Sequence, residues 1–122
     1  MTVLVVEDDP DQLIVRCMLI SHHGFETTPA ADANSAMRLA ASRHFDFAVI
    51  DIHLPSLQSG LSLLADLKAA HSGIGLIVLT GTDPAKLAHY PEMKLADEVI
   101  VKGSSAKALL AGLVRLSGRR AP

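Results

Sequence analysis

Four short apolar runs in this 122-residue sequence end in side chains that can take part in chemistry. Glu7 and Asp8 follow the first run, and Asp51 ends the second. Thr80 ends the third run, and Lys102 follows the fourth. A charged group at the end of a buried strand costs free energy unless it has a partner or a ligand there. Because ligand sites in open parallel sheets form beyond the carboxyl ends of the strands, we expect these five side chains to meet at one rim.

Three clustered carboxylates at this rim predict a site for a hard cation. Two like charges ~4 Å apart repel by on the order of 4 kcal/mol at an effective dielectric constant of about 20. Oxygen ligands with few carboxylates favour Mg²⁺ over Zn²⁺ or Ca²⁺. Asp51, at the centre, can then attack phosphorus and become an aspartyl phosphate. Thr80 and Lys102 would supply a hydrogen-bond donor and a counter-charge for the phosphoryl oxygens.

The apolar runs alternate with helical patterns along the whole chain. The five strands are predicted at residues 3–6, 25–28, 47–51, 76–79 and 99–101. Strands that alternate with helices predict an α/β fold with one doubly wound parallel sheet and helices on both faces. The second strand is half-polar and suits a sheet edge. The expected strand order is therefore 2-1-3-4-5, the flavodoxin-like arrangement.

Turn and capping residues mark where the predicted elements begin and end. Asp9 and Pro10 have the residue types of a helix N-cap and first turn. Pro29 is expected to end the second strand, and Gly60 to open the third helix. Pro91 would interrupt the fourth helix and keep it short.

The last helix is expected to start at a Ser104 or Ser105 cap and to lead into a short tail. Its inward-facing residues are predicted to be Leu109, Leu110, Leu113 and Val114. Residues 1–117 form the predicted domain, and residues 118–122 a polar tail or the start of a linker.

Composition limits the class of protein. A content of 49% apolar and 20% charged residues over this length predicts a single globular domain. The formal net charge of −2 gives no electrostatic footprint for nucleic acid. No apolar run approaches the length of a membrane span, and the only cysteine, Cys17, fits a reducing compartment. We therefore expect a cytoplasmic protein that binds no membrane, and no nucleic acid through this domain.

Four sequence pieces at the predicted strand ends resemble those of a known family. They are V-V-E-D-D, V-I-D-I-H-L-P, L-T-G and V-I-V-K, in that order and near the usual separations. Along essentially its whole length, the chain resembles the receiver domain (CheY-like) of bacterial two-component response regulators. The resemblance implies that Asp51 is the phospho-acceptor and that Asp8 is a direct Mg²⁺ ligand. It further implies that Glu7 acts through water and that the His53 backbone carbonyl completes the protein's ligands.

The resemblance implies a signalling module of a two-component system or phosphorelay. A histidine kinase or a histidine phosphotransfer protein would supply the phosphoryl group, and an unknown downstream protein would respond to it. Such a module catalyses only its own phosphorylation and dephosphorylation, so it is not otherwise an enzyme, and it can form a homodimer. Two alternatives stay open. One is a phosphorylation-independent interaction module, and the other an aspartyl phosphohydrolase, which needs a carboxylate where this chain has His53.

The chain departs from the family pattern near the surface that usually transmits the signal. The family's phosphate-binding hydroxyl and lysine match Thr80 and Lys102. The family usually has a proline after the lysine, whereas this chain has Gly103 there. The family often has an aromatic residue three positions before the lysine, where this chain has Val99. Valine has one χ torsion and no ring to turn inward. A conformational switch would therefore involve Thr80 and Gly81, with little contribution from Val99.

Overall fold

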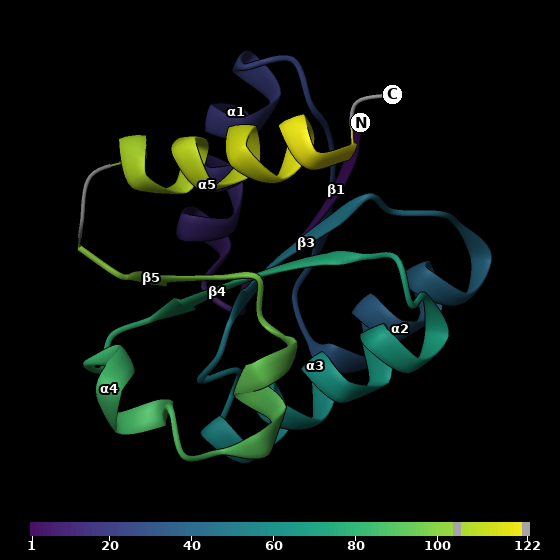
Figure 1. Cartoon of the computed structure of the whole chain (residues 1–122). Coiled ribbons are helices and arrows are strands. Elements are labelled where there is room, and N and C mark those ends of the chain that lie inside the picture. The colour runs from purple at the N-terminus through teal and green to yellow at the C-terminus, as the bar shows by residue number, and fades with distance from the viewer. Residues whose placement is uncertain (104–105, 121–122) are drawn as a thin grey trace.

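The strands of the computed structural model, which describes residues 1–103 and 106–120, form one parallel sheet (Figure 1). The strands are β1 (Thr2–Val6), β2 (Glu26–Ala30), β3 (Phe47–Asp51), β4 (Gly75–Thr80) and β5 (Glu98–Val101). Their order in the sheet is β2-β1-β3-β4-β5, and every neighbouring pair is parallel. This confirms the predicted fold class and strand order.

Helices connect successive strands and cover both faces of the sheet. In the described ranges they are α1 (Pro10–His22), α2 (Ala33–Ser42), α3 (Leu57–Ala70), α4 (Pro84–Leu87), the 3₁₀ helix η1 (Pro91–Leu95) and α5 (Ala106–Arg120). Helices α1 and α5 lie on one face, and α2 and α3 on the other (Figure 1). None of the described helices is long and apolar enough to cross a membrane.

Alternating side chains of the central strands build a core on each face of the sheet. Val3 and Val5 of β1 belong to the core beneath α1 and α5, whereas Leu4 and Val6 belong to the core against α2 and α3. Strands β3 and β4 are buried along their whole length. A strand buried on both faces contains few polar residues. In β3 and β4 the polar residues Asp51 and Thr80 stand last, at the carboxyl end of each strand.

Pro29 lies inside β2, so the prediction that it ends this strand was wrong. It pairs with Val5 of β1, and β2 is an edge strand with no neighbour on its other side in the described sheet. The hydrogen bonds from Glu26 N to Met1 O and from Glu7 N to Ala30 O show that the backbone polar groups of Glu26 and Ala30 face β1. Alternation then turns residue 29 outward, where a missing N–H breaks no bond of the sheet.

Helix α3 begins at Leu57, and Ser56 caps it by accepting a hydrogen bond from Ser59 N at 3.3 Å. The prediction that Gly60 opens this helix was therefore wrong. Gly60 lies one turn further in, where a Cβ atom would stand 1.8 Å from the backbone oxygen of Ile52. The glycine is required by this close approach of the helix to the end of β3, not by a helix start.

Helix α5 confirms part of its predicted inner face. Leu109 and Leu113 are buried and Leu110 is half-buried, but Val114 is 63% exposed, so the prediction for Val114 was wrong. The buried stripe continues at Leu116, which keeps the spacing of one helix face. The predicted caps, Ser104 and Ser105, lie outside the described residues. The division at residue 117 stays a prediction.

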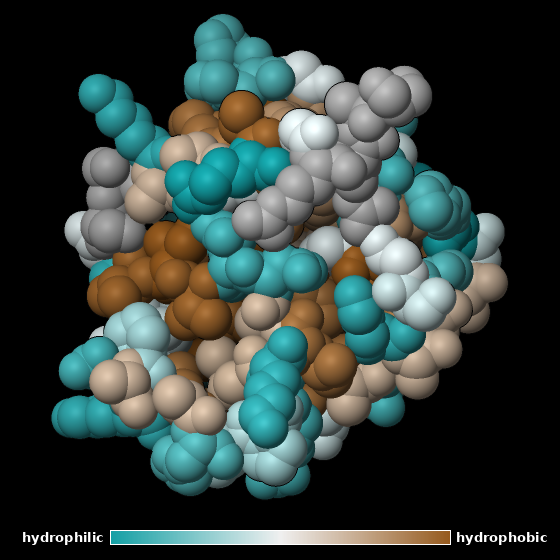
Figure 2. All heavy atoms as spheres, viewed as in Figure 1, coloured by the Kyte–Doolittle hydropathy of each residue, from teal (hydrophilic) through white to brown (hydrophobic). Residues whose placement is uncertain are grey.

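Helix α4 is short, as Pro91 predicts. Asp83 caps its start by accepting a hydrogen bond from Ala85 N at 3.0 Å, and Pro91 begins the separate helix η1. Val99 and Val101 of β5, on the strand face turned away from α5, are 36% and 40% exposed. Figure 2 shows hydrophobic atoms gathered over β5, between α4 and α5. The short helix thus leaves this side of the last strand partly uncovered.

Candidate functional site

The carboxyl ends of β1 and β3 bring three acidic side chains together. Oxygen atoms of Glu7, Asp8 and Asp51 all lie within 4.8 Å of one another. Glu7 and Asp51 are buried, and Asp8 is exposed. The carboxylate oxygens have the donor chemistry of a Mg²⁺ site, and the exposed Asp8 leaves a side open to water ligands. The acidic residues that the sequence places at strand ends therefore do meet at one rim.

Lys102, which follows β5, reaches the same cluster. Its Nζ atom lies 2.6 Å from Asp51 Oδ2 and 3.9 Å from Glu7 Oε2. Burial alone raises the pKa of the Asp51 carboxyl, but the hydrogen bond from Lys102, the interaction with Glu7 and the hydrogen bond from the His53 backbone N–H outweigh burial and lower this pKa. Asp51 is therefore held as a carboxylate, the form that can act as a nucleophile.

Glu7 differs from Asp51 in its electrostatics. Burial raises the pKa of Glu7, and the nearby Asp51 carboxylate raises it further, although a hydrogen bond from Arg16 opposes both effects. Its Oε1 atom also accepts a weak hydrogen bond from Asp9 N at 3.4 Å. The two neighbouring carboxyl groups thus shift in opposite directions: the pKa of Asp51 is lowered and that of Glu7 is raised.

Thr80 lies at the end of β4, but its hydroxyl is turned into the loop that follows. The hydroxyl donates to Thr82 O at 3.2 Å and accepts from Thr82 N at 2.9 Å. Thr80 is fully buried, whereas a Cβ atom on the next residue, Gly81, would meet nothing within 4 Å. The predicted phosphate-binding hydroxyl is thus close to the rim and held by its own loop.

His53 links the two loops that border the site. Its backbone N–H donates to Asp51 Oδ1 at 3.1 Å, and its ring Nε2 lies 3.2 Å from Thr82 Oγ1. The ring is therefore held at the rim between the loops after β3 and β4. The role of the His53 carbonyl as a metal ligand stays a prediction.

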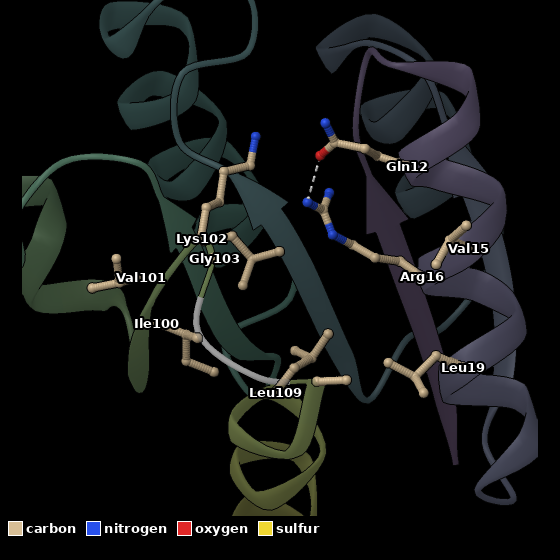
Figure 3. Close-up of a pocket in the computed structure, with 11 residues that line it drawn as sticks. Gln12, Val15, Arg16, Leu19, Ile100, Val101, Lys102, Gly103 and Leu109 are labelled. Carbon is tan, nitrogen blue, oxygen red and sulfur yellow. Dashed lines mark hydrogen bonds between the residues drawn. The ribbon is translucent and has the colours of Figure 1, made fainter.

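Arg16 of α1 is a member of this site that the sequence interpretation missed. Its Nη1 atom lies 2.8 Å from Glu7 Oε2, and its Nη2 donates to Gln12 Oε1 at 2.9 Å (Figure 3). A signal for it exists in the sequence, because Arg16 stands four residues before Ile20, which is fully buried. Residues four apart lie on the same helix face, so Arg16 had to approach the sheet.

A pocket of about 400 Å³ opens beside these charges, between α1 and the end of β5 (Figure 3). Arg16 extends from α1 towards the side on which Lys102 lies, and Val15 and Ile100 contribute apolar walls. Gly103 has a φ of 91° as the chain leaves β5. Glycine adopts this left-handed conformation readily, whereas proline, fixed near a φ of about −65°, cannot. This explains why a glycine follows the lysine here.

Comparison with known proteins shows the same fold and the same kind of domain. The family model for the response regulator receiver domain matches residues 3–114. The probable transcriptional regulatory protein TcrX of Mycobacterium tuberculosis is 35% identical over 82 residues, which cover 67% of this chain. The same alignment covers 35% of TcrX, so the chain spans about a third of that relative's length.

Two solved structures illustrate the likeness in three dimensions. A response regulator protein from Burkholderia pseudomallei, solved with a phosphorylated aspartic acid, a calcium ion and citrate, has a TM-score of 0.80 and 27% identity. The match covers 98% of this chain and 70% of that one. The response regulator protein TrrA from Thermotoga maritima, solved in complex with Mg²⁺–BeF, has a TM-score of 0.84 and 23% identity, and the match covers 94% and 97% of the two chains.

Proposed function

Because the chain belongs to the response regulator receiver domain family of two-component systems, we propose that it accepts a phosphoryl group on Asp51 and signals through protein contact. The observation that carries this proposal is the geometry around Asp51. Its carboxylate lies beside two further acids and 2.6 Å from the Lys102 ammonium, at the carboxyl edge of the sheet. This arrangement provides a nucleophile, a cation site and a counter-charge at one place.

In the proposed reaction, an Asp51 carboxylate oxygen attacks phosphorus and the bond from phosphorus to the donor's nitrogen breaks. The donor's imidazole keeps the electron pair of that bond, and Asp51 becomes an aspartyl phosphate. Glu7, Asp8, Asp51 and the His53 carbonyl would hold Mg²⁺, which supplies positive charge opposite the phosphoryl oxygens. The Lys102 ammonium would exchange its contact with the Asp51 oxygen for a contact with a phosphoryl oxygen.

Thr80 would complete the contacts to the phosphoryl group. Its hydroxyl is now satisfied by Thr82, so it must leave that partner before it can donate to a phosphoryl oxygen. Gly81 has free space around it and lets the loop follow this movement. Thr80 and Gly81 are therefore the proposed switch residues, and Val99, already partly exposed, contributes little.

The proposed partners follow from the same chemistry. A histidine kinase or a histidine phosphotransfer protein would donate the phosphoryl group, and a second protein would recognise the phosphorylated form. The chain would catalyse only its own phosphorylation and dephosphorylation, in the cytoplasm, where one unpaired cysteine is stable. We assign no nucleic-acid contact to this domain, because its net charge is −2.

We expect incubation with acetyl phosphate and Mg²⁺ to add one phosphoryl group to the chain, measured by intact mass spectrometry. Removal of divalent cations with EDTA should abolish the addition, because the acidic cluster then lacks the charge that offsets an incoming phosphate. A chain that stays unmodified at saturating Mg²⁺, or one that is modified equally in EDTA, would contradict the proposal.

Beryllofluoride with Mg²⁺ should shift backbone amide signals strongly at Asp51 and at residues 80–83. The signals of Val99 and residues 106–113 should move little, because β5 carries no aromatic ring to rearrange. Two-dimensional NMR on the labelled protein measures both sets. Large shifts along β5 and α5 would contradict this prediction, because they would show that the conformational change extends beyond the loop of residues 80–83. No shift at Asp51 would instead favour the phosphorylation-independent interaction module.

A further inference from the structure

Arg16 and Glu7 form an ion pair that is almost completely removed from water. The Arg16 side chain is 14% exposed and that of Glu7 is 2% exposed, with 2.8 Å between Nη1 and Oε2. Charge-assisted hydrogen bonds of this length are strong, and a buried carboxylate is costly without such a partner. Gln12, one turn earlier on α1, holds the other arm of the guanidinium at 2.9 Å. Arg16 is therefore held by two contacts, one to Glu7 and one to Gln12.

The same Glu7 belongs to the acidic cluster that the proposed function assigns to Mg²⁺. We propose that Arg16 is a resident cation of this site, which binds Glu7 in the metal-free protein and opposes the binding of Mg²⁺ beside it. This inference rests on the proposed function, because it concerns the affinity of the cation site that phosphorylation would need. It makes Arg16 a positioning residue, since it acts through Glu7 and does not touch Asp51 in the described contacts.

The charges of the site support this role. Three carboxylates face two cations, Arg16 on Glu7 and Lys102 on Asp51. Each cation lowers the negative potential that attracts a divalent ion. The buried position of the pair weakens screening by salt, so the opposition between Arg16 and Mg²⁺ persists at physiological ionic strength.

The pocket beside α1 gives Arg16 a place to move. It has a volume of about 400 Å³, and Arg16, Gln12 and Lys102 are among the residues that line it (Figure 3). Its apolar walls, which include Val15 and Leu19, can cover the methylene groups of a withdrawn arginine. Arg16 can thus leave Glu7 without entering the core.

The test is the Mg²⁺ dissociation constant of Arg16→Met, measured by NMR titration of the Asp8 and His53 amides at constant ionic strength. We expect it to fall by about tenfold, because one positive charge beside the ion is removed. Arg38→Met is the matched control, since Arg38 on α2 is exposed and bonds only to Ser35 in the described contacts. Its Mg²⁺ affinity should stay within about twofold of the wild type. Equal or weaker Mg²⁺ binding by Arg16→Met overturns the inference, and a purely structural arginine would give that result.

A second measurement uses the wild-type protein, so it does not depend on whether the Arg16→Met variant folds. In the wild-type protein, the Arg16 side-chain Nε–Hε signal should shift with Mg²⁺ and reach saturation together with the Asp8 amide. An Arg16 signal that is unchanged at saturating Mg²⁺ overturns the inference. If acetyl phosphate still modifies the wild type in that case, only the role of Arg16 fails. If neither the wild type nor Arg16→Met binds Mg²⁺, the proposed function fails with it.

Discussion

Asp51→Asn should take up no phosphoryl group from acetyl phosphate under conditions that fully modify the wild type. The amide keeps the size of the side chain but lacks the carboxylate whose Oδ2 atom lies 2.6 Å from Lys102 Nζ. The other acids cannot replace it. Glu7 is paired with Arg16, and burial raises its pKa, while Asp8 is exposed and forms no ion pair with Lys102 among the described contacts. We expect the loss to be complete within the detection limit of intact mass spectrometry.

Asp46→Asn is the matched control for this experiment. Asp46 stands directly before the other end of β3, where its carboxylate accepts a hydrogen bond from Thr2 N at 2.9 Å. It is a partly buried carboxylate next to the same strand, but at the amino end of that strand and so at the opposite edge of the sheet from Asp51. Its variant should therefore be modified at the wild-type level. Phosphoryl uptake that persists in Asp51→Asn would mean that another residue is the acceptor, and a peptide map would identify it.

Gly60→Ala should destabilise the fold by about 3 kcal/mol or more. The new Cβ would lie 1.8 Å from Ile52 O and 2.6 Å from Ile52 C, both backbone atoms that cannot rotate away. Either α3 must move off the sheet or the segment after β3 must shift. That segment includes His53, whose N–H donates to Asp51 Oδ1, so the site should change together with the stability.

Urea unfolding followed by far-ultraviolet circular dichroism measures this effect. Gly118→Ala is the control, because Gly118 also lies in a helix and a Cβ there would meet nothing within 4 Å. That variant should match or exceed wild-type stability, since alanine is the better helix former by up to ~1 kcal/mol. A Gly60→Ala protein within ~1 kcal/mol of the wild type would show that α3 yields without cost.

The sequence pattern was sufficient for the fold because its signals are local and point the same way. The buried runs that end at Val6, Asp51 and Thr80 have the length of strands, and helical patterns separate them. Parallel strands place their carboxyl ends at one edge, so the convergence of Glu7, Asp51 and Lys102 follows from the topology alone. The half-polar second strand then fixes the order.

Features that depend on the approach of two elements could not be obtained in this way. Gly60 resembles a helix start in sequence, but its role is set by the distance between α3 and the Ile52 backbone. The helix pattern could place Arg16 on the inner face of α1, but its pairing with Glu7 depends on how α1 lies over the sheet. Thr80 lies at the strand end where the sequence predicts it. The hydrogen bond of its hydroxyl to Thr82 depends on the shape of a loop that sequence patterns do not specify.

Pro29 also affects how the protein behaves towards other sheets. An edge strand usually offers a row of free N–H and C=O groups to which another strand can add, and this leads to edge-to-edge association. Residue 29 of β2 faces outward, and proline has no N–H there, so an added strand would lose a hydrogen bond in the middle of its ladder. The β2 edge is therefore protected against extension into larger sheets and fibrils. Self-association of this domain should accordingly use helices or the β5 side.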